Sequence, residues 1–104
     1  TGLAKGMIGV VHVFAEKSQE RVNNVVVAHE LLHTFGATDK YDYTTNMPRY
    51  PYGYADPAAN PRFPQRHAEI MAGRRPLSTF EAEIPTSLGQ TLIGAGTAAE
   101  IHWR

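Results

Sequence analysis

Blocks of apolar residues, separated by polar stretches, predict only a few regular elements in this chain. Residues 7–15 form a β-branched run, typical of a strand whose two faces are both largely apolar. The polar residues 16–21 predict a turn into a helix, and Asn23 or Asn24 is the expected N-cap. We expect this helix to run to about Phe35 and to stop at the glycine that follows.

The same pattern predicts which face of the helix is buried. The side chains expected to pack inward are Val25, Val26, Leu32 and Phe35. The strand before the helix has two interpretations: an ordinary core strand, or an edge strand that binds an extended peptide. His12 in that strand is expected to be packed or hydrogen-bonded rather than to bind a ligand.

Residues 39–66, which we term the Tyr/Pro-rich loop, hold all five tyrosines and five of the seven prolines. Such a composition opposes long helices and strands. The aromatic residues favour an ordered loop over a disordered one. A long ordered loop in a small domain is often functional, so we expect it to form one wall of a cleft.

The C-terminal third predicts a turn and one more helix. Residues 71–76, Met-Ala-Gly-Arg-Arg-Pro, are typical of a tight turn. Thr97 and Glu100 have the spacing of a capping box, in which Thr97 is the N-cap of a short final helix. That helix would bury Ile101 and Trp103. A strand, two helices, a loop and a turn together predict an α+β fold.

Composition and charge narrow the classes of protein. The 104 residues predict one domain, 1–104, with a modest core that a bound metal would stabilise. A formal net charge of zero gives no indication of a nucleic-acid partner. No stretch reaches the length of a transmembrane helix, and no signal peptide is visible. The chain begins at Thr1, which suggests a trimmed product or a piece of a longer chain; the compartment, secreted or cytoplasmic, stays open.

Candidate chemistry is concentrated in one motif, His-Glu-x-x-His-x-x-Gly-x-x-Asp, which ends at Asp39. His29 and His33 would lie one helical turn apart, where both imidazoles can hold one zinc ion. Glu30, beside that face, could act on a water molecule bound to the metal. The chain has no cysteine, so a metal site must use histidine and carboxylate, and Asp39 is the next residue that could reach back. Two histidines and one carboxylate leave the fourth position open, as a catalytic zinc requires.

Other interpretations of these residues remain open at this point. The residues that compete with Asp39 for the third position are Asp42, His67 and Glu69. Tyr41 is the tyrosine nearest to the motif, which makes it the candidate for contacting substrate or stabilising an oxyanion. Each tyrosine could instead only pack the loop, and a short motif of this kind can arise by chance on a helix.

The extended motif, with its glycine and a methionine in a tight turn downstream, resembles the metzincin clan of zinc metallopeptidases. The third ligand in that clan is usually histidine, but in a minority, including the snapalysin-like enzymes, it is aspartate. The resemblance spans roughly the predicted strand to the final helix. It implies one zinc ion bound by His29, His33 and Asp39, Glu30 as the general base, and Met71 in the Met-turn as a hydrophobic floor.

The resemblance also implies a fold, from which the chain departs in two places. The expected fold is a small metzincin-like domain with a short strand, an active-site helix, the Tyr/Pro-rich loop, the Met-turn and a short C-terminal helix. Metzincins usually have further strands and a backing helix before the edge strand, so the N-terminal sheet is expected to be truncated. Some members also carry a tyrosine two residues after the methionine, where this chain has Gly73.

The expected function is that of a zinc-dependent endopeptidase that acts on peptide or protein substrates. The first alternative is a non-catalytic, zinc-stabilised binding domain, or a fragment of a larger metalloprotease. The second is a zinc hydrolase with another class of substrate. Glu30 favours a catalytic site, because a purely structural zinc site has no use for that carboxylate.

Overall fold

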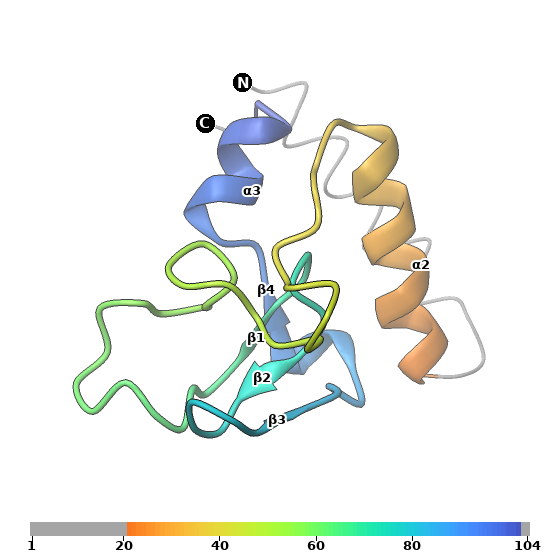
Figure 1. Cartoon of the computed structure of the whole chain (residues 1–104). Helices are drawn as coiled ribbons and strands as arrows, with labels where there is room; N and C mark the ends of the chain where they lie inside the picture. Colours follow the sequence, from red (N-terminus) through yellow and green to blue (C-terminus); the bar gives the residue numbers. More distant parts are fainter. Residues whose placement is uncertain (1–20, 103–104) are drawn as a thin grey trace.

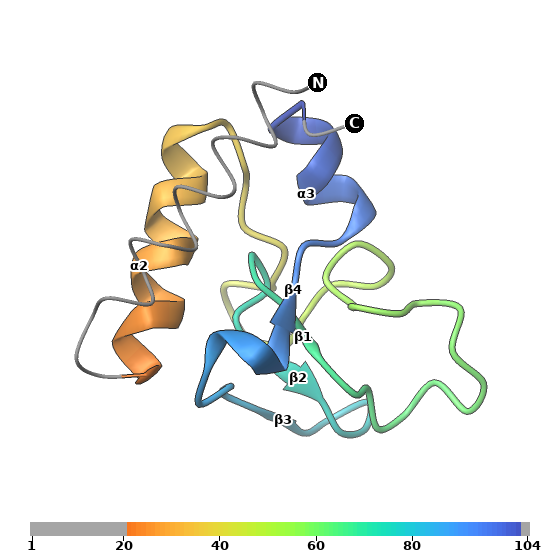
Figure 2. The same cartoon turned by 180° about the vertical axis from the view of Figure 1, so that it is seen from behind.

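The computed structural model describes residues 21–102, in which two helices surround a set of short strands (Figure 1). Helix α2 (Arg21–Thr34) lies on one side of the strands and the Tyr/Pro-rich loop on the other, as both views show (Figures 1 and 2). Helix α3 (Ala95–Glu100) lies at one end of the strands. The strand predicted at residues 7–15, with His12, is outside the described residues.

Two strands from distant parts of the chain form a parallel pair. β1 (Ala68–Glu69) runs beside β4 (Thr91–Leu92), with Ala68 opposite Thr91. A short 3-10 helix, η1 (Leu88–Gln90), leads into β4. Because β4 continues into α3, this pair places α3 close to the turn that follows β1.

The other two strands form a hairpin-like antiparallel pair. β2 (Arg75–Pro76) lies beside β3 (Ala82–Glu83), and an ion pair between Arg75 and Glu83 spans them. Short strands and helices in a compact chain, with a radius of gyration of 13.0 Å, agree with the predicted α+β class. No helix within residues 21–102 is long and apolar enough to span a lipid bilayer.

The start of α2 differs from the prediction. The helix already includes Arg21, so Asn23 and Asn24 lie inside it and neither is the N-cap. Asparagine is a preferred cap but is tolerated within a helix. Where a helix begins also depends on tertiary packing, which local sequence does not show.

The buried face of α2 was predicted with one error. Val25 and Leu32 are buried, with 6% and 1% of their surface exposed, and Phe35 packs against the core. Val26, in contrast, is 52% exposed. Successive residues of a helix point about 100° apart, and here the core lies on the side of Val25 while Val26 faces outward.

The end of α2 confirms the predicted stop at Gly36. Gly36 has a φ of +105°, a conformation that side chains disfavour. Its N–H donates to the carbonyl of His33, and the N–H of Ala37 donates to the carbonyl of Leu32, both at 3.1 Å. These two bonds form a Schellman motif, which reverses the chain after the helix.

A small core holds these parts together. Its buried members are Ala28 and Leu32 of α2, Ala37, Ile70 and Met71 after β1, and Ile101 at the end of α3. The predicted burial of Ile101 is therefore confirmed, while Trp103 is outside the described residues. The core joins α2, the turn after β1 and the end of α3, which are the three parts that surround the candidate site.

The Tyr/Pro-rich loop contains no helix or strand, as predicted. Its two isolated β-bridges join Tyr41 to Pro48 and Tyr54 to Ala68. The buried side chain of Gln65 accepts a hydrogen bond from the N–H of Asp56 and donates to the carbonyls of Asp56 and Arg62. The ring of Tyr54 packs edge-on against that of Phe63. Side-chain contacts and backbone hydrogen bonds within turns together supply the order that a sheet or helix would otherwise provide.

The capping box predicted for α3 is wrong. The helix begins at Ala95 with Gly94 as its N-cap. Thr97 lies inside the helix with none of its surface exposed, and Glu100 is the last helical residue. Glu100 does not bond back to its own helix; its carboxylate contacts the segment that follows α2. Glu100 was expected to bond to the start of its own helix, but it bonds instead to Thr38 and Lys40, which are distant in sequence. Local sequence cannot show such a partner.

Candidate functional site

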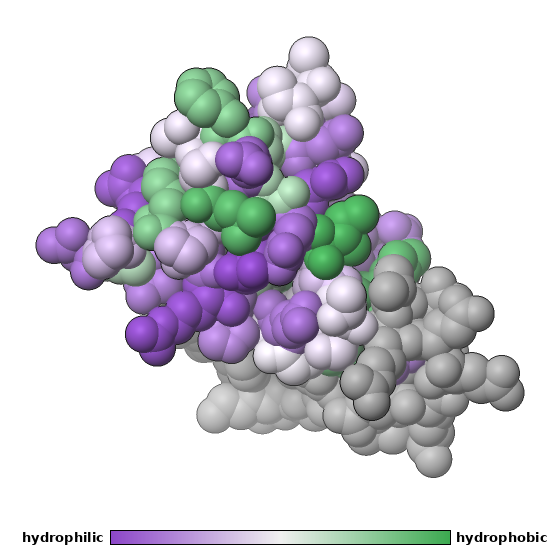
Figure 3. All heavy atoms as spheres, turned by 90° about the horizontal axis from the view of Figure 1, so that it is seen from below, coloured by the Kyte–Doolittle hydropathy of each residue, from purple (hydrophilic) through white to green (hydrophobic). Residues whose placement is uncertain are grey.

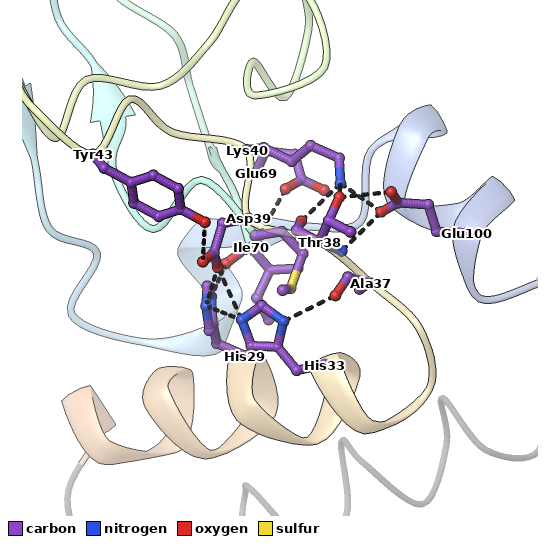
Figure 4. Close-up of polar contacts among 11 residues, drawn as sticks. His29, His33, Ala37, Thr38, Asp39, Lys40, Tyr43, Glu69, Ile70 and Glu100 are labelled. Carbon is purple, nitrogen blue, oxygen red and sulfur yellow. Dashed lines mark hydrogen bonds and ion pairs between the residues drawn. The ribbon is translucent and has the colours of Figure 1, made fainter.

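Two imidazoles of α2 point at the first carboxylate beyond the helix (Figure 4). The Nε2 atoms of His29 and His33 are 3.1 Å apart. One carboxylate oxygen of Asp39, Oδ1, lies 3.1 Å from Nε2 of His29 and 2.9 Å from Nε2 of His33. The one-turn spacing and the glycine break therefore bring these three side chains to one point.

Backbone carbonyls hold the outer edge of each imidazole. Nδ1 of His29 donates to the carbonyl of Ile70 at 2.8 Å, and Nδ1 of His33 donates to that of Ala37 at 2.9 Å. A carbonyl oxygen only accepts hydrogen bonds, so each Nδ1 carries a proton. In the neutral ring, each Nε2 then presents a lone pair, which is the form that binds a metal.

This arrangement places three electron-rich atoms within 3.1 Å of one another. Two Nε2 lone pairs and a carboxylate oxygen repel one another unless a cation, either a proton or a metal ion, lies among them. Donor atoms at about 2.0–2.1 Å from a tetrahedral zinc are about 3.3 Å apart, close to the separations found here. Two imidazoles and a carboxylate are also a donor set that suits zinc. The residues present thus fit a bound metal ion.

Glu30 lies next to the two imidazoles. One potential ligand atom from each of His29, Glu30 and His33 falls within 4.8 Å of the others, so these three residues could also hold a metal ion. Asp39, however, makes the shorter contacts with both Nε2 atoms. The third ligand stays a prediction, with Asp39 and Glu30 as its candidates beside the two imidazoles. The carboxylate of Glu30 is exposed to solvent.

The hydroxyl of one tyrosine, Tyr43, contacts this group. The hydroxyl of Tyr43 donates to Oδ2 of Asp39 at 3.0 Å, and this bond, with the charge of Asp39, raises the pKa of Tyr43. The ring of Tyr41 packs edge-on against that of Tyr43, with centroids 5.2 Å apart. Tyr41 lines the groove beside His29 and Glu30, and its contact with substrate stays a prediction.

Two of the competing acids have other partners. Asp42 accepts hydrogen bonds from the N–H groups of Thr44 and Thr45, and these bonds lower the pKa of Asp42. Glu69 is fully buried, and its carboxylate accepts hydrogen bonds from the N–H groups of Met71 and Gly94. Burial raises the pKa of Glu69 above its ordinary value, although these bonds oppose the shift.

The third competitor, His67, lies at a different cavity. That cavity, of about 780 Å³, is lined mainly by the Tyr/Pro-rich loop and includes Arg75. It contains none of His29, His33 and Asp39. The volume of a cavity therefore does not by itself identify the candidate site.

A smaller groove adjoins the imidazole of His29. It has a volume of about 210 Å³. Its lining residues are Val25, Val26, His29, Glu30, Tyr41, Ile70, Gly73, Ile84 and Pro85. Most of these side chains are apolar, so the groove offers a hydrophobic surface beside Glu30. The face seen from below shows hydrophobic residues beside hydrophilic ones (Figure 3).

Met71, the residue of the predicted Met-turn, is completely buried in the core that packs against α2. The turn continues to Gly73, which has a φ of +75°. The carbonyl of Met71 accepts a hydrogen bond from the N–H of Lys40 at 2.9 Å. The turn is thereby tied to the residue that follows Asp39, while its function as a floor of the site stays a prediction.

Helix α2 thus carries a His-Glu-x-x-His group that could hold a metal ion. Comparisons of the chain with models of known protein families, with curated proteins and with solved structures find no match.

Proposed function

We propose that this chain is a zinc-dependent endopeptidase of the metzincin type. One observation carries the proposal: two imidazoles, each with its Nδ1 proton held by a carbonyl, meet the Asp39 carboxylate at about 3 Å. The second support is Glu30, whose carboxylate belongs to the same group and is exposed to solvent. The resemblance to metzincins in the motif is the third.

The proposed reaction is hydrolysis of a peptide bond by water. A zinc ion bound by His29, His33 and Asp39 would polarise the scissile carbonyl and lower the pKa of its bound water to about 7. Glu30 takes a proton from the attacking water and later passes it to the leaving amine. The carbonyls of Ile70 and Ala37 hold the imidazoles in position, so the site needs little reorganisation during the reaction.

A peptide substrate would use the groove beside His29 and Glu30. The groove is predominantly apolar, so it suits an apolar substrate side chain. Tyr41 and Ile84, from two different segments, stand on its walls. Binding there would hold the neighbouring peptide bond close to Glu30.

The proposal predicts that Glu30→Ala lowers the rate of cleavage by orders of magnitude while zinc remains bound. Loss of a general base lowers rates by about 10²- to 10⁴-fold, and Glu30 is not among the proposed ligands. Cleavage of casein and bound zinc per chain are measured for both proteins. Glu81→Ala is the matched control, because Glu81 is also an exposed glutamate but lies outside the candidate site.

Wild-type cleavage should stop with a chelator and return with added zinc. If Glu30→Ala cleaved casein at the wild-type rate, the assignment of the base would be wrong. If the wild-type protein bound zinc but cleaved no member of a peptide library, the non-catalytic binding domain would be the better interpretation.

A further inference from the structure

The segment that carries Asp39 is anchored to α3 by one carboxylate. Oε1 of Glu100 accepts a hydrogen bond from the N–H of Thr38 at 2.9 Å, and Oε2 accepts one from the Thr38 hydroxyl at 2.6 Å. The ammonium of Lys40 donates to Oε1 at 2.5 Å. Glu100 therefore binds both residues that flank Asp39, across 62 and 60 positions of the chain (Figure 4).

Lys40 is unusually buried for a lysine, with 8% of its surface exposed. Its ammonium donates to Glu100 and also to the carbonyl and hydroxyl oxygens of Thr38, at 2.7 and 2.8 Å. These partners use all three of its N–H donors, so the buried charge is fully compensated. The backbone N–H of Lys40 is in turn held by the carbonyl of Met71.

We propose that Glu100 is a positioning residue for the metal site. Through Thr38 and Lys40 it fixes the backbone on both sides of Asp39, and so directs the Asp39 carboxylate at the imidazoles of His29 and His33. The inference rests on the proposed role of Asp39 as the third ligand. It makes α3 part of the site, because a ligand on a loop binds tightly only if the loop is already ordered.

The alternative is that Glu100 only anchors α3 to the rest of the fold. Both roles predict a lower free energy of unfolding when Glu100 is removed, so stability does not separate them. They differ in metal affinity: a positioning residue acts through Asp39 and loses its effect when Asp39 is absent. If Glu100 were only a general structural anchor, its removal would change zinc affinity by the same factor whether Asp39 is present or absent. A double-mutant cycle measures this difference.

The experiment measures zinc affinity, by competition with a chromophoric chelator, for wild type, Glu100→Ala, Asp39→Ala and the double variant. We expect Glu100→Ala to weaken zinc binding by roughly 10- to 100-fold, the usual effect of losing a group that orients a ligand. In the Asp39→Ala background, Glu100→Ala should cause no further loss. Glu100→Gln keeps one acceptor oxygen and should restore part of the affinity.

Glu83→Ala is the control, because it removes another ion-paired carboxylate, the partner of Arg75, and should leave zinc affinity unchanged. Wild-type affinity in Glu100→Ala, or an equal loss in both backgrounds, would overturn the proposal. Wild-type affinity in Asp39→Ala would overturn it together with the ligand assignment. If circular dichroism shows that Glu100→Ala is unfolded, Thr38→Val takes its place, with the same criteria. Zinc affinity is the only quantity that this test compares. A protein that binds zinc but cleaves no peptide would therefore contradict the proposed function and leave the proposed role of Glu100 standing.

Discussion

The candidate ligands depend on backbone groups that the motif does not contain. The imidazole of His29 bonds to the carbonyl of Ile70, 41 positions away, and that of His33 to the carbonyl of Ala37 in the turn after α2. These bonds select the tautomer whose Nε2 lone pairs face Asp39. The motif supplies the side chains, and the turns after α2 and β1 supply the groups that orient them.

At the same scale, Tyr43→Phe should weaken zinc binding a few-fold. The Tyr43 hydroxyl holds Oδ2 of Asp39, so its removal frees that carboxylate to rotate away from the imidazoles. Tyr41→Phe is the matched control, because it removes a hydroxyl from the ring packed on Tyr43. Zinc titrations of the two variants compare them directly. Equal affinities would show that the contact between Tyr43 and Asp39 has no part in metal binding.

Among the elements, the ends of the two helices decide the shape of the site. Gly36 ends α2 in a Schellman motif, and the chain then turns back toward Asp39. The same glycine lies against the end of α3: a Cβ added at Gly36 would be 3.2 Å from the backbone oxygen of Glu100. The residue that reverses the chain thus also allows α3 to approach.

Gly36→Ala is therefore expected to lower the free energy of unfolding by about 1–2 kcal/mol, the usual cost of a side chain in a left-handed conformation. Urea unfolding in the presence of a chelator measures the loss without a contribution from metal binding. Gly89→Ala is the control, because Gly89 has no positive φ and a Cβ there meets only the Ser87 hydroxyl, at 3.8 Å. A similar stability for both variants would show that neither the backbone conformation nor the contact with α3 matters.

Across the whole molecule, two carboxylates join distant parts of the fold and titrate in opposite directions. Burial raises the pKa of Glu69, which links β1 to the N-terminus of α3. Burial also acts to raise the pKa of Glu100, but the hydrogen bonds from Lys40 and Thr38 outweigh it and lower that pKa. The ordinary value for both is 4.5.

Stability should therefore depend on pH with opposite signs at the two sites. Folded Glu69 binds its proton more tightly than the unfolded chain does, so its contribution is present below pH 4.5 and is lost as the pH rises through the raised value. Folded Glu100 binds its proton less tightly, so its contribution is present above pH 4.5 and is lost as the pH falls through the lowered value.

Urea midpoints of chelator-treated wild type, Glu69→Gln and Glu100→Gln, measured from pH 3 to pH 8, test this. As the pH rises above 4.5, the stability of wild type should fall relative to that of Glu69→Gln. As the pH drops below 4.5, the stability of wild type should fall relative to that of Glu100→Gln. Each variant serves as the control for the other. Differences that do not change with pH would show that neither carboxylate is coupled to folding.

Local sequence was sufficient wherever the backbone alone sets the geometry. The one-turn spacing of His29 and His33 follows from the helix, and the end of α2 at Gly36 follows from the freedom of glycine at positive φ. The lack of regular elements in the Tyr/Pro-rich loop follows from its prolines.

Tertiary structure decided everything that depends on partners far along the chain. It placed Asp39, rather than Asp42 or Glu69, against the imidazoles. It also placed the Tyr43 hydroxyl within hydrogen-bond distance of this carboxylate.

Glu100 shows the physical reason. Its spacing from Thr97 predicted a local cap, but the folded chain offered it a buried ammonium and an N–H group near Asp39. Charge-assisted bonds of this kind are stronger than a helix cap, and they exist only once the chain has folded. The motif therefore determined which side chains could hold a metal ion, and the folded structure determined how they are held.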